Sequence, residues 1–103
     1  MSHFDLESNS SLYVIILRKV EGRELDQGII NRHVEHLRSL DQEGKLILCG
    51  PFSDHPSGAL VIRAMDKDEA TQVANQDPFV KEGYRTCEIR TWQIAHRGNN
   101  YLG

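Results

Sequence analysis

The order in which strand-like and helix-like segments follow one another constrains the fold of this chain most. Apolar runs rich in β-branched and aromatic residues predict four strands, and apolar residues at helical spacing predict two helices. The strands are expected at 12–18, 45–51, 59–65 and 84–94, and the helices at 28–44 and 66–76. Asp66 is suited to cap the start of the second helix, and Gly44 the end of the first. The order βαββαβ is typical of an α+β, ferredoxin-like sandwich.

The chain of 103 residues is long enough for one hydrophobic core and shows no internal repeat or linker. We expect a flexible N-terminal arm at 1–11, one domain at 12–95 and a polar C-terminal tail at 96–103. Twelve basic and fifteen acidic side chains give a net charge of -3 without a basic run, so nucleic acid is not an expected partner. No apolar run approaches the roughly 20 residues of a membrane span, so no membrane partner is expected.

The start of the chain and its two cysteines predict a cytoplasmic location. Acidic residues precede the first short apolar run, which is not the pattern of a secretory signal peptide. Cys49 and Cys87 form no CxxC pair or other metal-ligand spacing, and both stand in apolar, strand-like surroundings. We therefore expect reduced, buried thiols.

Both faces of the predicted sheet carry apolar side chains. In the first strand, Tyr13, Ile15 and Leu17 alternate with Leu12, Val14 and Ile16. Two helices can cover only one face of a four-stranded sheet. Leaving about six large side chains in water would forfeit about 1.5 to 3 kcal/mol each, against a total stability of about 5 to 15 kcal/mol. We therefore expect a second copy of the chain to cover the other face, which gives a homodimeric α+β barrel.

His33 interrupts an apolar stripe on the first predicted helix. On a helical wheel of about 100° per residue, it falls near the centre of the stripe formed by Ile29, Ile30, Leu37 and Leu40. A buried imidazole without a hydrogen-bond partner costs about 1 to 3 kcal/mol, so this side chain needs a partner or a wet cavity. Two interpretations are open: a core histidine satisfied by a backbone carbonyl, or a general base on a pocket wall.

Asp77 is the best candidate for a carboxylate partner of His33. The segment "DPFV" places it directly before Pro78, in a connector that also holds the large apolar Phe79. A carboxylate often fixes the tautomer of a general base and stabilises its charged form. An Asp before Pro is also a common helix N-cap, so both interpretations are open. They are compatible, because a carboxylate offers about four lone-pair sites on two oxygens.

Two longer segments, "HVEHLRSLDQEGKLILCGPF" and "DPFVKEGYRTCEIRTW", resemble the YCII-related (YciI-like) family. The resemblance extends from about Leu12 to Gln93 and rests on the helical histidine, the Gly-Pro end of the second strand and the DP-aromatic connector. It implies a ferredoxin-like dimeric α+β barrel with a His and Asp pair in a cleft, which falls on His33 and Asp77. Many relatives have Arg-Pro shortly before the histidine, so we expect the pocket mouth to differ at Ile30, Asn31 and Arg32.

The resemblance extends more distantly to muconolactone isomerases and to a dehydrochlorinase of chlorinated hydroxyhydroquinones. It therefore implies a cofactor-free enzyme that acts on a small ring-derived or carboxylated substrate. In such an enzyme His33 would take a proton, Asp77 would orient the imidazole, and elimination or isomerisation would follow. We expect the substrate pocket to be lined by Tyr13, Gly50, Pro51, Phe52 and Phe79.

Two other functions are compatible with the sequence. One is a ligand-binding or accessory module that uses the same pocket without chemistry, and the other is a cofactor-independent monooxygenase of the related barrel type. A metal site is not expected. His33 and His36 are three residues apart on a helix, but no HExxH pattern or third ligand accompanies them.

Overall fold

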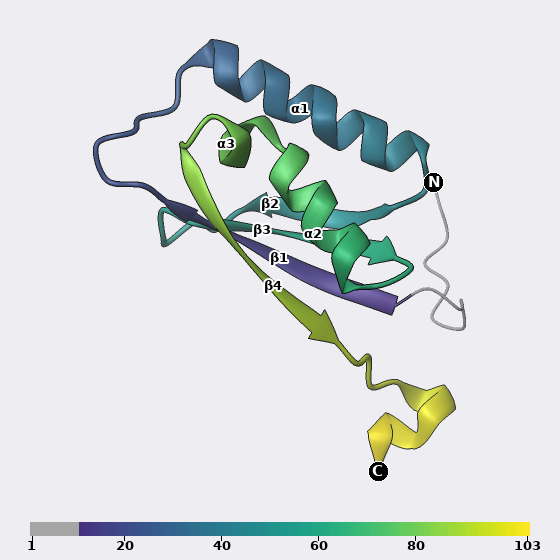
Figure 1. The fold of residues 1–103 in the computed structure, drawn as a ribbon. Helices are drawn as coiled ribbons and strands as arrows, with labels where there is room; N and C mark the ends of the chain where they lie inside the picture. Colours follow the sequence, from purple (N-terminus) through teal and green to yellow (C-terminus); the bar gives the residue numbers. More distant parts are fainter. Residues whose placement is uncertain (1–10) are drawn as a thin grey trace.

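The computed structural model describes residues 11–103, and its elements follow the predicted order (Figure 1). Most of the expected N-terminal arm, 1–11, lies outside the described residues, and Ser11 already belongs to the first strand. The elements are β1 Ser11–Lys19, α1 Gln27–Gln42, β2 Leu46–Pro51, β3 Gly58–Ala64, α2 Lys67–Gln76, α3 Pro78–Lys81, β4 Arg85–Trp92 and the 3₁₀ helix η1 Arg97–Leu102.

The four strands form one antiparallel sheet in the order β2-β3-β1-β4. The helices α1, α2 and α3 all lie on the same side of it (Figure 1). Ile15 of the central strand β1 lies opposite Leu60 of β3 and Ile89 of β4, so these three side chains point to one face. The α+β, ferredoxin-like fold expected from the order of segments is confirmed.

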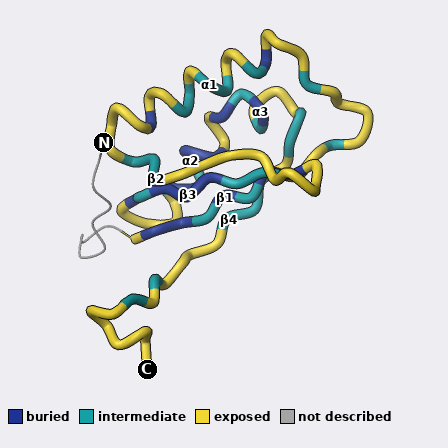
Figure 2. The backbone as a smooth tube through the Cα atoms, turned by 180° about the vertical axis from the view of Figure 1, so that it is seen from behind, coloured by how far each residue is buried: buried dark blue, intermediate teal, exposed yellow. Residues whose placement is uncertain are grey.

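The hydrophobic core lies between the helices and this face of the sheet (Figure 2). Ile15 of β1, Ile29 of α1 and Ile62 of β3 are completely shielded from solvent. Tyr13 and Leu17 are buried on the same side of β1 as Ile15, as the two-residue period of a strand requires. The second helix contributes small side chains, which let it lie close to the sheet: Ala70, Val73 and Ala74.

Side-chain caps fix the starts of α1 and α2. Asp26 Oδ1 accepts a hydrogen bond from the backbone N–H of Ile29 at 3.0 Å, so α1 begins one residue earlier than expected. Asp66, predicted as a cap, accepts the N–H of Glu69 at 2.8 Å. Gly44 follows the end of α1 at a φ of 73°, the left-handed conformation that is typical of a glycine at this position.

The sheet face that points away from the helices mixes buried and exposed apolar side chains. Leu12 lies opposite Trp92 of β4, and Val61 lies opposite Leu48 of β2. Leu12 and Val61 are each only 6% exposed, whereas Leu48 and Trp92 are 62% and 50% exposed. The prediction of a second apolar face therefore holds for these strands.

The edge strand β4 adds charge to the same face. Glu88 lies opposite Ile16, and its carboxylate forms ion pairs with Arg18 at 3.2 Å and Arg90 at 2.7 Å. This polar margin borders the apolar residues of the central strand. Such a combination of an apolar centre and a polar rim is common at protein interfaces.

Both cysteines are less buried than expected. Cys49 is exposed and Cys87 is half-buried, and each is a free thiol. They belong to β2 and β4, which are the two edge strands of the sheet. An edge strand has a neighbour on one flank only, so an apolar sequence around a residue does not guarantee its burial there.

The structure contains two short helices that were not predicted from the sequence, α3 and η1. The connector at 77–83 contains the one-turn helix α3, and the polar tail forms η1, which extends away from the sheet (Figure 1).

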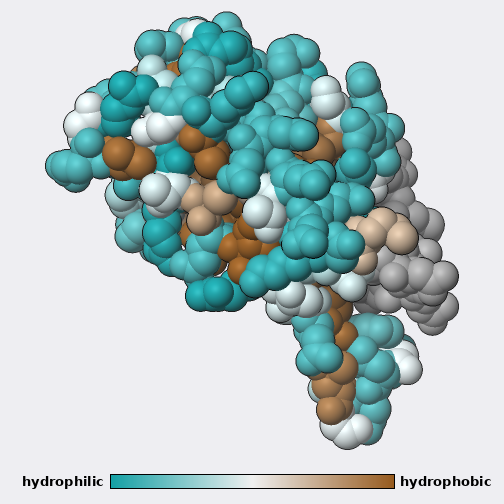
Figure 3. Space-filling view, in the orientation of Figure 1, coloured by the Kyte–Doolittle hydropathy of each residue, from teal (hydrophilic) through white to brown (hydrophobic). Residues whose placement is uncertain are grey.

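The side of the molecule seen in Figure 3 is mostly hydrophilic with small apolar patches. In the described part of the chain, no helix has the length and hydrophobicity needed to cross a membrane.

Candidate active site

His33 and Asp77 meet between α1 and the junction of α2 with α3. The Nδ1 atom of His33 lies 2.8 Å from Oδ1 of Asp77. The side chains are 14% and 2% exposed, respectively. The apolar stripe of α1 thus turns the histidine inward, as expected, and its polar partner is a side-chain carboxylate.

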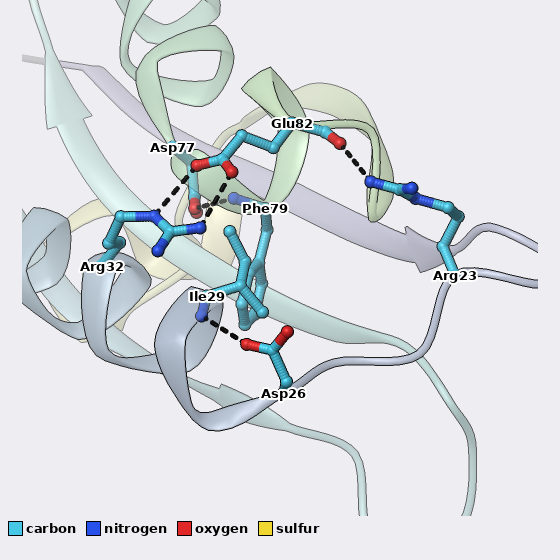
Figure 4. A network of polar contacts seen from close by, with 7 residues as sticks. All are labelled: Arg23, Asp26, Ile29, Arg32, Asp77, Phe79 and Glu82. Carbon is cyan, nitrogen blue, oxygen red and sulfur yellow. Dashed lines mark hydrogen bonds and ion pairs between the residues drawn. The ribbon is translucent and has the colours of Figure 1, made fainter.

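Asp77 also caps the one-turn helix α3. Its Oδ1 accepts the backbone N–H of Phe79 at 2.9 Å (Figure 4), and Pro78 occupies the first helical position, where no N–H donor is needed. The two interpretations of the DP segment, cap and histidine partner, are therefore satisfied by the same oxygen. This second bond holds the carboxylate in a fixed orientation towards His33.

The contact determines which imidazole nitrogen can act as a base. An ionised carboxylate only accepts hydrogen bonds, so Nδ1 of His33 is the donor to Asp77, and the neutral form of the imidazole then carries its lone pair on Nε2. His33 is among the residues that line the neighbouring cavity. Its Nε2 makes no hydrogen bond to any of the residues at 11–103. Of the two ring nitrogens, Nδ1 is therefore held by Asp77, and Nε2 has no partner within the described part of the chain.

Phe79 fixes the plane of the imidazole. The two rings stack with centroids 3.8 Å apart and an angle of 6° between their planes. A ring held by a hydrogen bond at one edge and by stacking on one face has little freedom to rotate. This arrangement gives His33 the preorganisation that proton transfer requires.

An ion pair on the outer side links α1 to the end of α3. The guanidinium of Arg32 donates to both carboxylate oxygens of Glu82, at 2.9 and 3.1 Å, and Arg23 donates to the backbone carbonyl of Glu82 at 2.8 Å (Figure 4). The hydrogen bond to Glu82 raises the pKa of Arg32. Arg32 is thus engaged with α3, while Ile30, two residues earlier, lines the cavity.

The cavity beside His33 has a volume of about 520 Å³, which suits a small organic ligand. It lies between α1, the ends of β2 and β3 with their connecting loop, and the first residue of β4. Of the residues predicted to line a substrate pocket, four do so: Gly50, Pro51, Phe52 and Phe79.

Tyr13 is not among the residues that line the cavity, so its predicted place there is corrected. It is 4% exposed within the core and lies opposite Ile62. The residue of β1 that lines the cavity is Leu17, which lies about 13 Å further along the strand at 3.3 Å per residue. Alternation identified the correct face of the strand but not the position along it.

Three polar lining residues did not follow from the sequence analysis. His55 and Ser57 belong to the loop between β2 and β3, and Arg85 is the first residue of β4. Arg85 precedes Cys87 and Ile89 by two and four residues, so strand alternation was the signal that could have placed it on the helix-facing side. Cys49 also lines the cavity, but desolvation raises the pKa of its thiol, which disfavours a thiolate nucleophile.

A second histidine, His36, lies near His33 and Asp77. Burial lowers the pKa of His36 below its ordinary 6.5, and the nearby His33 lowers it further, while Asp77 and the Val73 backbone oppose the shift. His36 Nε2 and Asp77 Oδ2 are both buried, and neither has a hydrogen-bond partner among residues 11–103. Residues 11–103 contain no group of three or more His, Cys, Asp or Glu side chains that could hold a metal ion.

The chain matches the YCII-related domain over residues 11–93. The uncharacterized protein YjpA of Bacillus subtilis (strain 168) is 31% identical to it over 83 residues, which are 81% of this chain and 98% of that protein.

Among solved structures, the fold is similar to that of 5-chloro-2-hydroxyhydroquinone dehydrochlorinase (TftG) from Burkholderia phenoliruptrix AC1100, in complex with 2,5-dihydroxybenzoquinone. The TM-score is 0.61 and the identity 24%, with 80% of this chain and 93% of that chain covered. This likeness shows a shared fold. The domain match over most of the sequence, and a relative aligned almost from end to end, show that the chain belongs to the YCII-related family.

Proposed function

We propose that the protein is a cofactor-free enzyme that removes a proton from a small, ring-derived or carboxylated substrate. The observation that carries this proposal is the 2.8 Å contact between His33 and Asp77 on the wall of a cavity of about 520 Å³. A base that is oriented by a buried carboxylate, with its second nitrogen available to a ligand, is the arrangement that general base catalysis uses.

In the proposed reaction, Nε2 of His33 takes a proton from an acidic carbon or hydroxyl of the substrate. The electron pair left behind forms a double bond, and either a leaving group departs with its bonding electrons or the proton returns at another carbon. The first outcome is an elimination and the second an isomerisation. Asp77 stabilises the imidazolium and does not itself take the proton.

The likeness to a dehydrochlorinase supports this reaction class. That enzyme was solved with 2,5-dihydroxybenzoquinone, a small planar ring compound. The cavity here is of the size that such a ring needs, and its wall is largely apolar, with Leu17, Leu37 and Phe79 among the lining residues. A planar ring can stack or pack against such a wall.

The test is turnover by the wild-type protein, His33→Asn and the control His96→Asn. The first candidate substrate is 5-chloro-2-hydroxyhydroquinone, and other small ring compounds are tested after it. Turnover is measured as chloride release and as a change in absorbance. We expect His33→Asn to lower kcat by about 10²-fold or more, and His96→Asn, in the C-terminal tail, to leave it unchanged. A His33→Asn variant with wild-type turnover would exclude the proposed role.

A second candidate function is a binding module that uses the cavity without chemistry. Two contacts favour it: Asp77 has a structural duty as the cap of α3, and His33 packs face to face on Phe79. A metabolite-library thermal-shift screen separates the two functions when combined with the turnover assay. A compound that raises the melting temperature by binding the folded state, and that is recovered unchanged after long incubation, favours the binding module.

We also propose that the protein is a homodimer formed through the sheet face opposite the helices. Val14 and Ile16 are only half-buried there, and Leu48 and Trp92 are exposed. A second copy related by a two-fold axis would cover this apolar centre, while the charged residues of β4 would lie at the rim.

The free thiols Cys49 and Cys87 suit a reducing compartment, and on that basis we propose a cytoplasmic location.

A further inference from the structure

Arg85 brings a positive charge to the cavity wall. It is the first residue of β4 and lies opposite Lys19 at the end of β1, on the helix-facing side. Its side chain lines the cavity together with His33 and Phe79. One guanidinium nitrogen donates to the backbone carbonyl of the neighbouring Tyr84 at 2.8 Å. The other N–H groups of this five-donor side chain make no hydrogen bond to residues 11–103.

The charge of Arg85 is not neutralised by the described part of the protein. Four other arginines form ion pairs with glutamates: Arg18, Arg32, Arg38 and Arg90. Arg85 has no such pair at residues 11–103, and no Asp or Glu of that range lines the cavity. A cation at a largely apolar wall loses hydration without gaining a counter-charge, so an anionic ligand group is the favourable occupant.

Arg85 and His33 both lie near the ring of Phe79 and line the same cavity. The Phe79 centroid lies 3.8 Å from the centroid of the His33 ring and 5.7 Å from Cζ of Arg85. A single small ligand that packs beside this ring can therefore contact the base with one end and the guanidinium with the other. Arginine is well suited to the second contact, because its planar fork matches the two oxygens of a carboxylate.

We propose that Arg85 binds a carboxylate of the ligand, so that the site takes small, planar organic acids. This inference rests on the cavity being the substrate site of the proposed function, and it narrows the substrate class. The carboxylate would hold the molecule at Arg85, and the reacting C–H or O–H would face Nε2 of His33. Arg85 would then determine specificity, whereas His33 carries out the chemistry.

The test compares benzoate with its neutral match benzamide, by NMR titration of the ¹⁵N-labelled full-length chain. We expect benzoate to shift the amide signals of Gly50, Phe52 and residues 57–60, and to bind about tenfold or more tightly than benzamide. In Arg85→Gln this preference should disappear, and in Arg85→Lys it should be partly retained. The control Arg38→Gln removes an arginine that is paired with Glu35 outside the cavity and should bind benzoate like the wild type.

Three results would overturn the proposal. These are equal binding of benzoate and benzamide, unchanged benzoate binding in a folded Arg85→Gln variant, and no binding of either compound up to about 10 mM, where even weak carboxylate contacts register. Inorganic phosphate serves as a competitor. Displacement of benzoate by phosphate at equal concentration would show a general anion site and would also contradict the assignment of a carboxylate.

The outcome is independent of the proposed reaction, because benzoate need not be turned over. His33→Asn should still bind benzoate with the wild-type preference. If His33→Asn abolishes turnover but Arg85→Gln changes neither binding nor KM, the reaction stands and the carboxylate site fails. If benzoate binding depends on Arg85 but His33→Asn leaves turnover intact, the carboxylate site stands and the proposed base fails.

Discussion

The Nδ1 atom of His33 and the Oδ1 atom of Asp77 lie 2.8 Å apart, although the two residues are 44 positions apart in the chain. The histidine comes from the middle of α1, and the aspartate is the N-cap of α3. Oδ1 of Asp77 therefore receives two hydrogen bonds, one from the imidazole and one from the Phe79 backbone. Stability and proposed chemistry depend on the same atom, and substitutions at position 77 can separate them.

Asp77→Asn should keep the cap and impair the base. Asparagine is as good an N-cap as aspartate, so we expect little change in the free energy of unfolding. The amide oxygen that keeps the cap still accepts the Nδ1–H of His33, but the neutral amide no longer stabilises the imidazolium, so kcat should fall by about 10²- to 10⁴-fold. Urea denaturation, turnover and the ¹⁵N chemical shifts of the His33 ring measure the three effects.

Asp77→Ala is the matched comparison, because it removes the cap as well. We expect it to lose about 1 kcal/mol or more of stability relative to Asp77→Asn, with turnover equally impaired. Equal stability of the two variants would show that the capping bond contributes little. Wild-type turnover in Asp77→Asn would show that the carboxylate is not needed by the base.

The fold could be predicted from the sequence because each of its determinants is local. The β-branched runs, the helical spacing and the caps at Asp66 and Gly44 are all properties of neighbouring residues, and the structure has them as expected. The exposure of Cys49 could not be predicted in the same way. It depends on β2 being an edge strand, and strand order is not encoded in the periodicity of a single segment.

The site was predictable where a residue broke a pattern, and not where it continued one. His33 stood out as a polar residue in an apolar stripe, and Asp77 as a carboxylate before proline. Arg85 sits at the start of a strand, where a charged residue is ordinary. His36 lies at the edge of the stripe, and its interaction with the Val73 backbone depends on the approach of α2, which no feature of α1 reveals.

Gly58 is required for the close approach of β2 and β3 at the cavity. A Cβ at this position would lie 2.9 Å from the backbone oxygen of Gly50 and 3.2 Å from Cα of Pro51. Backbone atoms cannot yield as a flexible side chain can, so we expect Gly58→Ala to destabilise the protein by about 1 to 3 kcal/mol. Gly50→Ala is the control, since a Cβ there meets nothing within 4 Å. Chemical denaturation of both variants measures the difference, and equal stabilities would contradict the predicted clash.

His36 should make the protein less stable in mild acid. Because burial lowers the pKa of His36 in the folded state, the unfolded chain binds a proton at this site at a higher pH than the folded chain does. The contribution of the neutral imidazole is therefore complete above the ordinary pKa of 6.5 and is lost as the pH falls below it. We expect His36→Gln to reduce the loss of stability between about pH 7.5 and 5.5 in urea titrations. An identical pH dependence in wild type and variant would show that His36 is not the group responsible.

The proposed dimer predicts that one charge on the outer sheet face separates the subunits. Leu48 is 62% exposed on the edge strand β2 and lies opposite Val61 of β3 on this face. Leu48→Glu would place a carboxylate in the covered interface without a partner, at a cost of several kcal/mol. Light scattering coupled to size exclusion should then report a monomer, whereas the wild type gives twice that mass. Met65→Glu is the control, because Met65 is 76% exposed but lies beyond the end of β3, and it should remain dimeric. A wild-type protein of monomer mass at all concentrations tested would show that there is no such dimer. A dimeric Leu48→Glu variant would show that the subunits contact each other elsewhere.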